Sequence, residues 1–318
     1  MAFRTLLIYN PAAGPWDMTR VLKRLAEELG AHAWQVELVE THKPGDAVWL
    51  ARQASRDGLD LVLVAGGDGT INEAVNGVAG SNTTLGIVPV GTGNILAHQM
   101  HMPILSPMPP YQIGEMADAL LHSRVQRVDA GLINGRYFVC WAGAGLDAEI
   151  AAQLEPRPRY AKRLGTLPYI IAAVSVASWF KGFRTRVSVE GRAFNTRALL
   201  IVASNIQLYA AFFTIARHAY MDDGLLDIFI FKGLGFSYAL RHFLHMLMGQ
   251  RHLNDPAVIQ VLARHVQVET TPAVAVHLDG DPYGETPALV GLEAGALRFL
   301  TPPQAPGDLF CKPPEQIL

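Results

Sequence analysis

The stretch Leu61-Val-Leu-Val-Ala-Gly66-Gly67-Asp68-Gly69-Thr70-Ile71-Asn72-Glu73 is the segment from which the fold can be predicted. Its first five residues have the length and apolar character of a buried strand, and the glycines that follow predict a tight loop. We expect Thr70 to cap a helix that begins at Ile71. Because backbone N–H groups at a helix N-terminus suit a phosphate group, this loop is a candidate phosphate site.

Asp68 adds a second chemical property to this loop. A carboxylate beside a phosphate is unfavourable unless a divalent cation or a hydrogen-bond donor offsets its charge. Asp68 therefore favours a nucleotide bound with Mg²⁺ over the binding of a simple anion. For a glycine pair taken alone, an ordinary strand-to-helix turn that binds no ligand is the alternative.

Strand and helix signals alternate on both sides of the loop. Two helices are expected to begin at Asp17 and Asp46 and to stop at Gly30 and Gly58, which are typical capping and stop residues. Repeated β-α-β units of this length predict a parallel sheet covered by helices. The strands are expected at residues 5–9, 34–39, 61–65 and 85–88.

Polar turns follow three of these strands. Ligands of such α/β folds collect at the carboxyl ends of the parallel strands. We therefore expect the three turns to share one edge of the sheet and to form a binding site there. They are Asn10–Gly14, Gly66–Thr70 and Gly91–Asn94.

The sequence pattern changes after residue 127. Short alternating apolar runs with glycine-rich turns predict a β-rich, mainly antiparallel domain over residues 128–301, after an α/β domain over residues 1–127. Residues 302–318 are free to pack back on the first domain. A helix expected at 168–180 is about 20 Å long, shorter than the roughly 30 Å of a bilayer core. Besides this helix and one at 236–249, the expected elements are strands at 128–133, 137–141, 185–190, 198–203, 226–231, 266–269, 274–278 and 297–300.

The composition limits the class of protein. A length of 318 residues predicts two domains, and 50% hydrophobic with 17% charged residues excludes a disordered chain. The net charge of −2, without a basic and aromatic-rich motif, excludes nucleic acid as a partner. Cys140 and Cys311 are too few for a disulfide framework. The N-terminus shows no long apolar signal region, so a cytoplasmic enzyme is expected.

Six motifs occur in a fixed order along nearly the whole chain. They are Asn10-Pro…Gly14; Gly66-Gly-Asp-Gly-Thr70 followed by Asn72-Glu73 and Asn76-Gly77; Pro89-Val-Gly-Thr-Gly-Asn94; Gly143-Ala-Gly-Leu-Asp-Ala148; Met221-Asp-Asp-Gly-Leu-Leu-Asp227; and His277-Leu-Asp-Gly-Asp281. In this combination they resemble the diacylglycerol and sphingosine lipid kinase family. Each motif alone is weak, whereas six in one order are specific.

The resemblance implies a two-domain fold, similar to that of NAD kinases, in which a β-rich, sandwich-like domain follows an α/β nucleotide-binding domain. It further implies that ATP and Mg²⁺ bind in the cleft between the domains. A lipid hydroxyl of the diacylglycerol or long-chain-base type would accept the γ-phosphate. Peripheral contact with a membrane and a homodimer are open alternatives.

The resemblance also implies roles for individual residues. Asp281 would be the catalytic carboxylate, and Asp68 would hold or orient Mg²⁺. A metal would lie at Asp223, with backbone carbonyl groups near Tyr220 and Leu225. The nucleotide contacts would be Asn10, Thr41, Gly66, Gly67, Asp68, Gly69, Thr70, Ile71, Thr92 and Asn94.

Two residues depart from the family pattern. Many members have Asp after the Gly-Thr-x-Asn turn, where this chain has Ile95, so a polar link made there is missing. Members usually carry Glu where this chain has Asp281, which is one methylene shorter. A catalytically silent relative that binds nucleotide or lipid is therefore one alternative. An NAD or sugar kinase is another, because those enzymes share the Gly-Gly-Asp-Gly signature.

Several constellations also have structural interpretations. The turn Gly143–Ala148 resembles a dinucleotide-binding fingerprint. However, it is not followed by the strand with an acidic residue at its end that such a site requires. The histidine pairs 98/101 and 242/245 lack a third zinc ligand. Two acidic segments, 222–227 and 279–282, have the composition of simple turns. The basic run Arg157, Arg159, Lys162 and Arg163 is a solvated face by default, with contact to an anionic membrane as the alternative.

Overall fold

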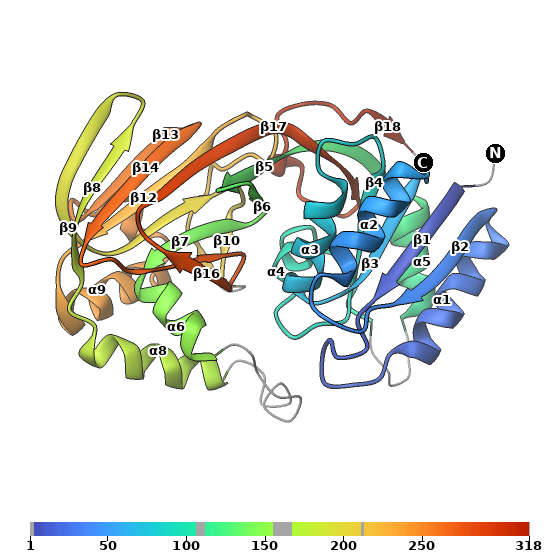
Figure 1. Ribbon diagram of the computed structural model, residues 1–318, viewed down its shortest axis with the longest axis horizontal. Helices are drawn as coiled ribbons and strands as arrows, with labels where there is room; N and C mark the ends of the chain where they lie inside the picture. The colour runs from blue at the N-terminus through green and yellow to red at the C-terminus, as the bar shows by residue number, and fades with distance from the viewer. Residues whose placement is uncertain (1–2, 106–111, 155–166, 211–212, 318) are drawn as a thin grey trace. The chain divides into compact units, whose positions relative to one another are not determined.

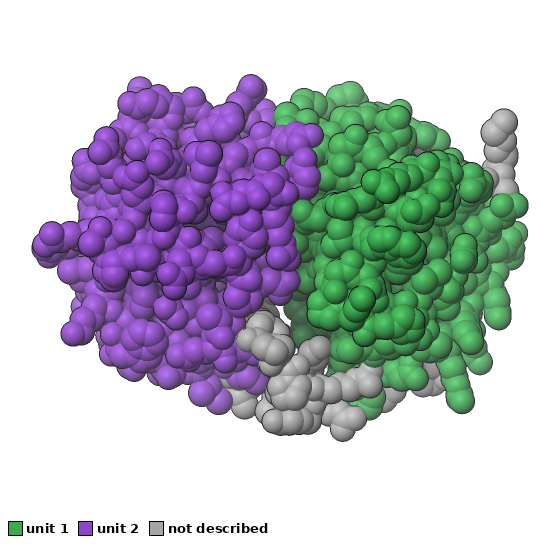
Figure 2. All heavy atoms as spheres, in the orientation of Figure 1, with its two compact units in different colours: residues 1–130, 294–318 green, residues 131–293 purple. Residues whose placement is uncertain are grey.

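The computed structural model describes residues 3–105, 112–154, 167–210 and 213–317. The chain divides into two compact units, coloured separately in Figure 2: unit 1 comprises residues 1–130 and 294–318, and unit 2 comprises residues 131–293. The sequence placed the first boundary at residue 127 and the end of the β-rich domain at residue 301. Because Arg298 and Phe299 pair with a strand of unit 1, the end of the last long strand belongs to unit 1.

Unit 1 contains the predicted parallel sheet covered by helices (Figure 1). Its parallel strands are β1 (Phe3–Tyr9), β2 (Trp34–Glu40), β3 (Leu61–Gly66), β4 (Thr84–Pro89) and the end of β17 (Ala288–Thr301). They lie in the order β17-β4-β3-β1-β2. β3 and β4 are buried over their whole length, which explains their continuous apolar sequences.

The helices of unit 1 pack in pairs on this sheet. They are α1 (Thr19–Ala31), α2 (Asp46–Arg56), α3 (Asp68–Val78), α4 (Ile95–Gln99), α5 (Ile113–Leu121) and the short η2 (Gly307–Leu309). α1 packs against α5, and α2 packs against α3. β5 (Arg124–Ile133) pairs antiparallel with β18 (Gln316–Ile317), so the C-terminal segment returns to unit 1.

Helix α3 begins earlier than the sequence predicted. Its first residue is Asp68, and its N-cap is Gly67 in an extended conformation, whereas Thr70 was expected to cap a helix starting at Ile71. The prediction was wrong because the Thr70 hydroxyl accepts a hydrogen bond from Asn10 and does not cap the helix. The glycine-rich loop is therefore only a short turn between β3 and α3.

The other helix ends also differ slightly from the prediction. The N-cap of α1 is Met18, although Asp17 Oδ1 still accepts the N–H of Thr19 at 2.9 Å. The N-cap of α2 is Gly45, with φ of 89°, and Asp46 is the first helical residue. The Asp46 carboxylate instead accepts the N–H groups of the preceding loop at residues 42 and 43. These acidic residues stabilise the helix starts from neighbouring positions.

Unit 2 is β-rich and mainly antiparallel, as predicted. Its strands are β6 (Arg136–Phe138), β7 (Trp141–Gly145), β8 (Phe183–Val189), β9 (Arg192–Ser204), β10 (Leu208–Tyr209), β11 (Phe213–Thr214), β12 (Leu226–Lys232), β13 (Val258–Ala263), β14 (His265–Thr271), β15 (Ala275–Leu278), β16 (Asp281–Glu285) and the start of β17. They form the order β16-β15-β7-β9-β8-β14-β17, while β9 also pairs with β12, and β12 with β13.

The helices of unit 2 are α6 (Leu146–Leu154), α8 (Leu167–Trp179), α9 (Gly235–Leu247) and the short η1 (Arg251–Asn254). Among the residues described, none of the helices is both long and apolar enough to cross a membrane. The single strand predicted at 137–141 is instead divided between β6 and β7. The division occurs because the N–H groups of Val139 and Cys140 bind the carboxylate of Asp279.

Candidate active site

Three loops of unit 1 meet at the carboxyl edge of the parallel sheet. Asn10, the first residue after β1, donates a hydrogen bond from Nδ2 to Thr70 Oγ1 at 3.0 Å. Its own N–H binds Ala65 O at 3.0 Å, and its Oδ1 accepts the N–H of Ala12 at 2.9 Å. The Asn10 side chain thus joins the first loop to the first turn of α3.

Glycines allow these loops to touch through their backbones. A Cβ atom on Gly14 would lie 2.1 Å from Val90 O, and a Cβ atom on Gly91 would lie 2.6 Å from Gly67 Cα. Both distances are far inside van der Waals contact. The three turns predicted to share one edge therefore lie together, and their packing requires glycine at positions 14 and 91.

Asp68 connects α3 to the loop that follows β4. Its Oδ1 accepts the N–H of Ile95, the first residue of α4, at 2.8 Å. Its Oδ2 faces Gly93, where a Cβ atom would approach it to 2.5 Å. Although the side chain of Ile95 cannot make a polar link, its backbone makes one. Asp68 therefore fixes the position of this loop.

Asn94 closes the same loop from within. It has φ of 50°, its Oδ1 accepts the N–H of Gly91 at 3.0 Å, and its Nδ2 donates to Gly91 O at 2.9 Å. The Asn94 side chain is buried. Asn94 thus shapes the loop through its own backbone contacts, while Thr92 lies half-buried within the loop.

Thr41 and Ile71 lie further from the meeting point of the loops. Thr41 follows β2, is buried, and donates its N–H to Tyr9 O at 2.9 Å. Ile71 is 3% exposed, so its side chain belongs to the core beneath α3. The structure therefore brings Asn10, Asp68 and Thr70 together, places Thr41 after the neighbouring strand, and buries Ile71.

In unit 2, the acidic hairpin between β15 and β16 contains two carboxylates with different surroundings. Asp279 is buried, has φ of 50°, and accepts the N–H groups of Val139, Cys140 and Trp141 at 2.8–3.0 Å. Asp281 is the first residue of β16 and is half-buried. Asp279 therefore holds the hairpin in place, and Asp281 is the carboxylate of this motif that a ligand can reach.

The loop before β12 carries the residues expected to hold a metal. Asp223 Oδ1 accepts the N–H of Leu225 at 2.9 Å, while Tyr220 is 37% exposed. Burial, together with the charge of Asp223, raises the pKa of Asp227 to about 6. The described residues contain no group of three or more His, Cys, Asp or Glu side chains that could hold a metal ion. A metal here would need backbone carbonyl groups as additional ligands.

Both units match known protein families. The family profile of the diacylglycerol kinase catalytic domain matches residues 4–133, and that of the YegS C-terminal NAD kinase beta sandwich-like domain matches residues 141–301. The chain belongs to the diacylglycerol kinase family of lipid kinases. This family membership confirms the resemblance and the two-domain fold expected from the six motifs.

Individual relatives of this lipid kinase cover most of the chain. Diacylglycerol kinases from Bacillus subtilis (strain 168) and Staphylococcus carnosus (strain TM300) are 28% and 26% identical to it. The alignments cover 89% and 91% of this chain, and 91% and 92% of the relatives. A crystal structure of a diacylglycerol kinase from Bacillus anthracis str. Sterne has a TM-score of 0.74 and 26% identity, covering 95% of this chain and 98% of that one.

The lipid kinase also contains a buried polar network that the sequence did not predict. Asp147 Oδ2 accepts hydrogen bonds from the Tyr209 hydroxyl at 2.7 Å and from His277 Nε2 at 2.8 Å. The N–H of Gly280 donates to His277 Nδ1 at 3.2 Å, which assigns the proton of the neutral ring to Nε2. Burial and the Asp147 carboxylate raise the pKa of Tyr209 well above its ordinary value. The network ties the acidic hairpin to the start of α6.

Gly143 has a structural role in this network. A Cβ atom on Gly143 would lie 2.2 Å from both Asp147 Oδ2 and His277 Nε2. The glycine that imitates a dinucleotide fingerprint therefore provides room for a carboxylate and an imidazole. Asp147 and His277 both lie in motifs that carry the family resemblance, but only the register of β15 against β7 shows that they meet.

The second histidine pair is used in packing. His242 Nε2 lies 2.7 Å from Lys232 O, and His245 Nδ1 lies 2.9 Å from Asp255 Oδ2. Because the two rings bind different acceptors, they do not form a shared zinc site. Burial lowers the pKa of His242, which favours its neutral form.

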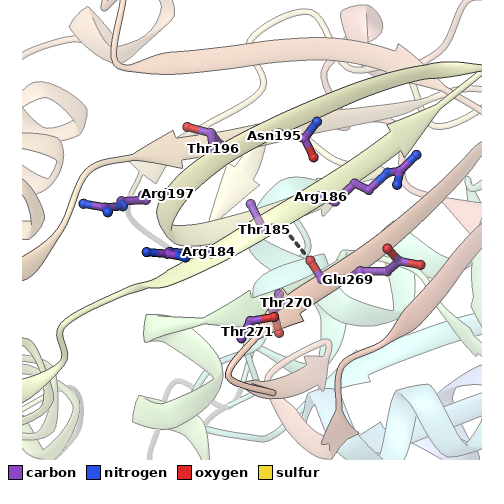
Figure 3. Close-up of a pocket in the computed structure, with 9 residues that line it drawn as sticks. All are labelled: Arg184, Thr185, Arg186, Asn195, Thr196, Arg197, Glu269, Thr270 and Thr271. Carbon is purple, nitrogen blue, oxygen red and sulfur yellow. Dashed lines mark hydrogen bonds between the residues drawn. The ribbon is translucent and has the colours of Figure 1, made fainter.

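A surface hollow of about 440 Å³ lies on β8, β9 and β14 (Figure 3). Arg184 stands directly opposite Arg197 across β8 and β9, and the Thr185 hydroxyl donates to Glu269 O at 2.9 Å. The lining consists of Arg184, Thr185, Arg186, Asn195, Thr196, Arg197, Glu269, Thr270 and Thr271. None of the residues predicted for the site is among them, so the hollow is separate from the candidate active site.

Proposed function

We propose that this lipid kinase transfers the γ-phosphoryl group of ATP to a hydroxyl group of a diacylglycerol-type lipid, in the presence of Mg²⁺. The observation that carries the proposal is the meeting of three loops of unit 1 around the first turn of α3. Relatives that bear the name diacylglycerol kinase support the lipid acceptor.

The residues at the start of α3 fit the phosphate groups of a nucleotide. The first N–H groups of an α-helix have no acceptor within the helix, and they carry the positive end of its dipole. A Cβ atom on Gly67 would find its nearest neighbour, Gly91 Cα, at 3.8 Å, so this glycine leaves open space beside its backbone. Phosphate oxygens would accept hydrogen bonds from this turn.

The chain also offers oxygen ligands of the kind that Mg²⁺ prefers. They are the Asp68 carboxylate in unit 1 and the Asp223 carboxylate, with neighbouring backbone carbonyl groups, in unit 2. When bound, Mg²⁺ neutralises the negative charge on the phosphate oxygens during transfer. Asp68 would contribute its carboxylate while it positions the loop that contains Thr92.

Asp281 would act as the general base. It would take the proton from the lipid hydroxyl as the hydroxyl oxygen forms its bond to the γ-phosphorus, and ADP would leave. The buried Asp279 and the network of His277 with Asp147 would keep the hairpin rigid, so that Asp281 has a fixed position. A shorter carboxylate can serve if the hairpin brings it within hydrogen-bonding distance of the hydroxyl.

Transfer of label from γ-³²P-ATP to a set of acceptors tests the proposal. Dioleoylglycerol, phosphatidylglycerol, sphingosine and NAD would be offered separately, the lipids in detergent micelles. We expect label in phosphatidic acid, abolished by EDTA. Label in NADP alone would identify a small-molecule kinase, and nucleotide binding without any transfer would identify a catalytically silent relative.

A further inference from the structure

Helix α8 is apolar apart from Ser175 and Ser178, but only one side of it is buried. Ala172, Val176 and Phe180, spaced by four residues, face inward and are at most 8% exposed. The opposite side carries four large apolar side chains that are 51–60% exposed: Ile170, Ile171, Val174 and Trp179. A helix that is apolar all round is normally enclosed by protein or lipid. The apolar outer side of α8 is therefore exposed, although a sequence of this kind is normally covered by protein or lipid.

Helix α9 is amphipathic, but its apolar stripe faces outward. The stripe follows helical spacing and is 41–60% exposed: Phe236, Leu240, Phe243, Leu244 and Leu247. The inner side carries His242, which is 4% exposed and binds Lys232 O. A helix on the surface of a water-soluble protein normally has the reverse arrangement.

The two helices form one surface. α8 and α9 pack against each other and lie side by side in Figure 1. We call this surface the α8–α9 face and define it by the nine residues Ile170, Ile171, Val174, Trp179, Phe236, Leu240, Phe243, Leu244 and Leu247. Exposed apolar side chains gathered on two adjacent helices are typical of an interaction surface.

The two segments of the chain that carry the face contain cations and no acids. The sequence contains no Asp or Glu between Glu155 and Glu190, and none between Asp227 and Asp255. Lys181 follows the C-terminal end of α8, and Arg251 follows that of α9; both are exposed. An apolar surface whose own helices carry no acids and are followed by exposed cations is complementary to an anionic lipid surface.

We propose that the α8–α9 face docks this protein on the surface of a membrane that contains anionic lipids. The apolar side chains would enter the boundary between headgroups and acyl chains, and the cations would meet lipid phosphates. A second copy of the chain fits less well. A two-fold interface would bring the same two segments of both copies together, and these segments carry cations but no acids to pair with them. Docking needs no nucleotide and therefore stands apart from the proposed phosphoryl transfer. The face is also distinct from the basic run at 157–163, which lies outside the described residues.

Co-sedimentation of the full-length protein with vesicles, without ATP, tests the proposal. Vesicles of phosphatidylcholine with one third phosphatidylglycerol would be compared with vesicles of phosphatidylcholine alone. We expect binding to the anionic vesicles to fall by about tenfold or more when Ile171, Val174, Leu240 and Leu247 are all replaced by Gln. The double variant Lys181→Glu with Arg251→Glu should lose the preference for anionic vesicles.

Two exposed leucines outside the face provide a matched control. Leu262 on β13 and Leu289 on β17 are 50% and 59% exposed, similar to the four substituted residues. Leu262→Gln with Leu289→Gln should bind vesicles as the wild type does. Equal binding by the wild type and the fourfold variant, with both folded by circular dichroism, would overturn the proposal. It would also be overturned by a wild-type dimer that ignores vesicles and becomes monomeric in the fourfold variant.

The fluorescence of Trp179 gives a second readout. Trp179 is 51% exposed at the end of α8. If the face enters the headgroup boundary, adding anionic vesicles will shift the tryptophan emission to shorter wavelength. Trp179→Phe should lose that shift and still sediment with the vesicles. A full shift in Trp179→Phe would show that another surface is in contact with the lipid.

Discussion

Asp68 positions the loop at Ile95, and substitution can separate this structural role from the role that we propose for its charge. Asp68→Asn keeps an oxygen that can accept the N–H of Ile95 but removes the negative charge. We expect the melting temperature to stay close to wild type and kcat to fall by about 10²-fold or more, because a preorganised charge near the phosphates is lost. Asp68→Ala should also lose about 1 kcal/mol of folding free energy, because it removes the acceptor for the N–H of Ile95. Wild-type kcat in Asp68→Asn would exclude a role for the charge.

Asp281 is the residue through which the general-base role can be tested. A positioned base contributes about 10²–10⁴-fold in rate, so Asp281→Asn should lower kcat by that factor while nucleotide affinity stays unchanged. Asp281→Glu tests the length of the side chain. If the hairpin is placed for the shorter acid, the longer one will also lower kcat. A change of less than about twofold in both variants would mean that Asp281 is only a turn residue.

Asp227 gives unit 2 a distinctive response to pH. Its pKa is raised from 3.8 to about 6, chiefly by burial. Between about pH 4 and 6 the folded chain therefore keeps a proton that the unfolded chain releases, so stability falls as pH rises through this window, by about 2–3 kcal/mol. Asp227→Asn lacks this titration and can still accept the hydrogen bond from Gln260.

The check is a series of thermal unfolding curves in EDTA from pH 4 to pH 7. The melting temperature of Asp227→Asn, relative to wild type, should rise across that range. A difference that stays constant with pH would show that the carboxyl has its ordinary pKa.

At the scale of secondary-structure elements, the glycines that follow β3 and β4, Gly67 and Gly91, differ in the space around them. Gly67 has ordinary extended dihedral angles, and a Cβ atom there would meet nothing closer than 3.8 Å. A Cβ atom on Gly91 would overlap the backbone of Gly67 at 2.6 Å. We expect Gly67→Ala to melt as the wild type does but to bind ATP more weakly, because its methyl group would occupy space beside the turn that we propose to bind phosphate. Gly91→Ala should lose stability, by about 1–3 kcal/mol.

Calorimetric titration with ATP, together with thermal unfolding, distinguishes the two effects. Gly30 is a suitable control because it lies in α1, and a Cβ atom on it would have no neighbour within 4 Å. Gly30→Ala should leave ATP affinity unchanged and raise stability slightly. Unchanged ATP affinity in Gly67→Ala would place the phosphates elsewhere.

The same elements show which features a sequence can reveal. Strands β1, β3 and β4 were predictable because each contains a short apolar run bounded by turn residues. The N-cap of α3 was not, because Thr70 is bound by Asn10, a residue 60 positions away. The pairing of Asp147 with His277 spans 130 positions and depends on strand register. The local sequence pattern therefore predicts strands, helices and loops, whereas the hydrogen-bond partners of polar side chains can be identified only from the tertiary structure.

In unit 2, the sequence pattern did not reveal two of the strands or the roles of the two carboxylates in the acidic hairpin. β13 and β16 were missed because their apolar alternation is weak: β13 is only half-buried, and β16 begins with Asp281 and Pro282. Within the acidic hairpin, the sequence could not distinguish the buried Asp279 from the accessible Asp281. The three N–H groups that bind Asp279 come from Val139 and Cys140, between β6 and β7, and from Trp141 at the start of β7, about 140 residues earlier.

At the scale of the whole molecule, unit 1 is built from two separate parts of the chain. The end of β17 pairs with β4, and Leu297, Phe299 and Leu300 are at most 1% exposed. Arg127 and Arg298 both form ion pairs with Glu315. A fragment of residues 1–130 alone would lack these buried side chains and leave the edge of β4 unpaired.

We therefore expect the 1–130 fragment to be unfolded or aggregated. A single chain that joins residues 1–130 to residues 294–318 through a glycine-serine linker should regain a cooperative thermal transition and ATP binding. Cooperative unfolding of the 1–130 fragment by itself, measured by circular dichroism, would contradict this expectation.

The divided composition of unit 1 also affects the order of events during protein synthesis. Domains usually fold one after another as they leave the ribosome, beginning with the first. Here the strand that completes the parallel sheet is translated only after every residue of unit 2. While unit 2 is being synthesised, the edge of β4 in unit 1 therefore stays unpaired. Chaperones that bind such edges would be expected to act on this chain until residue 301 has emerged.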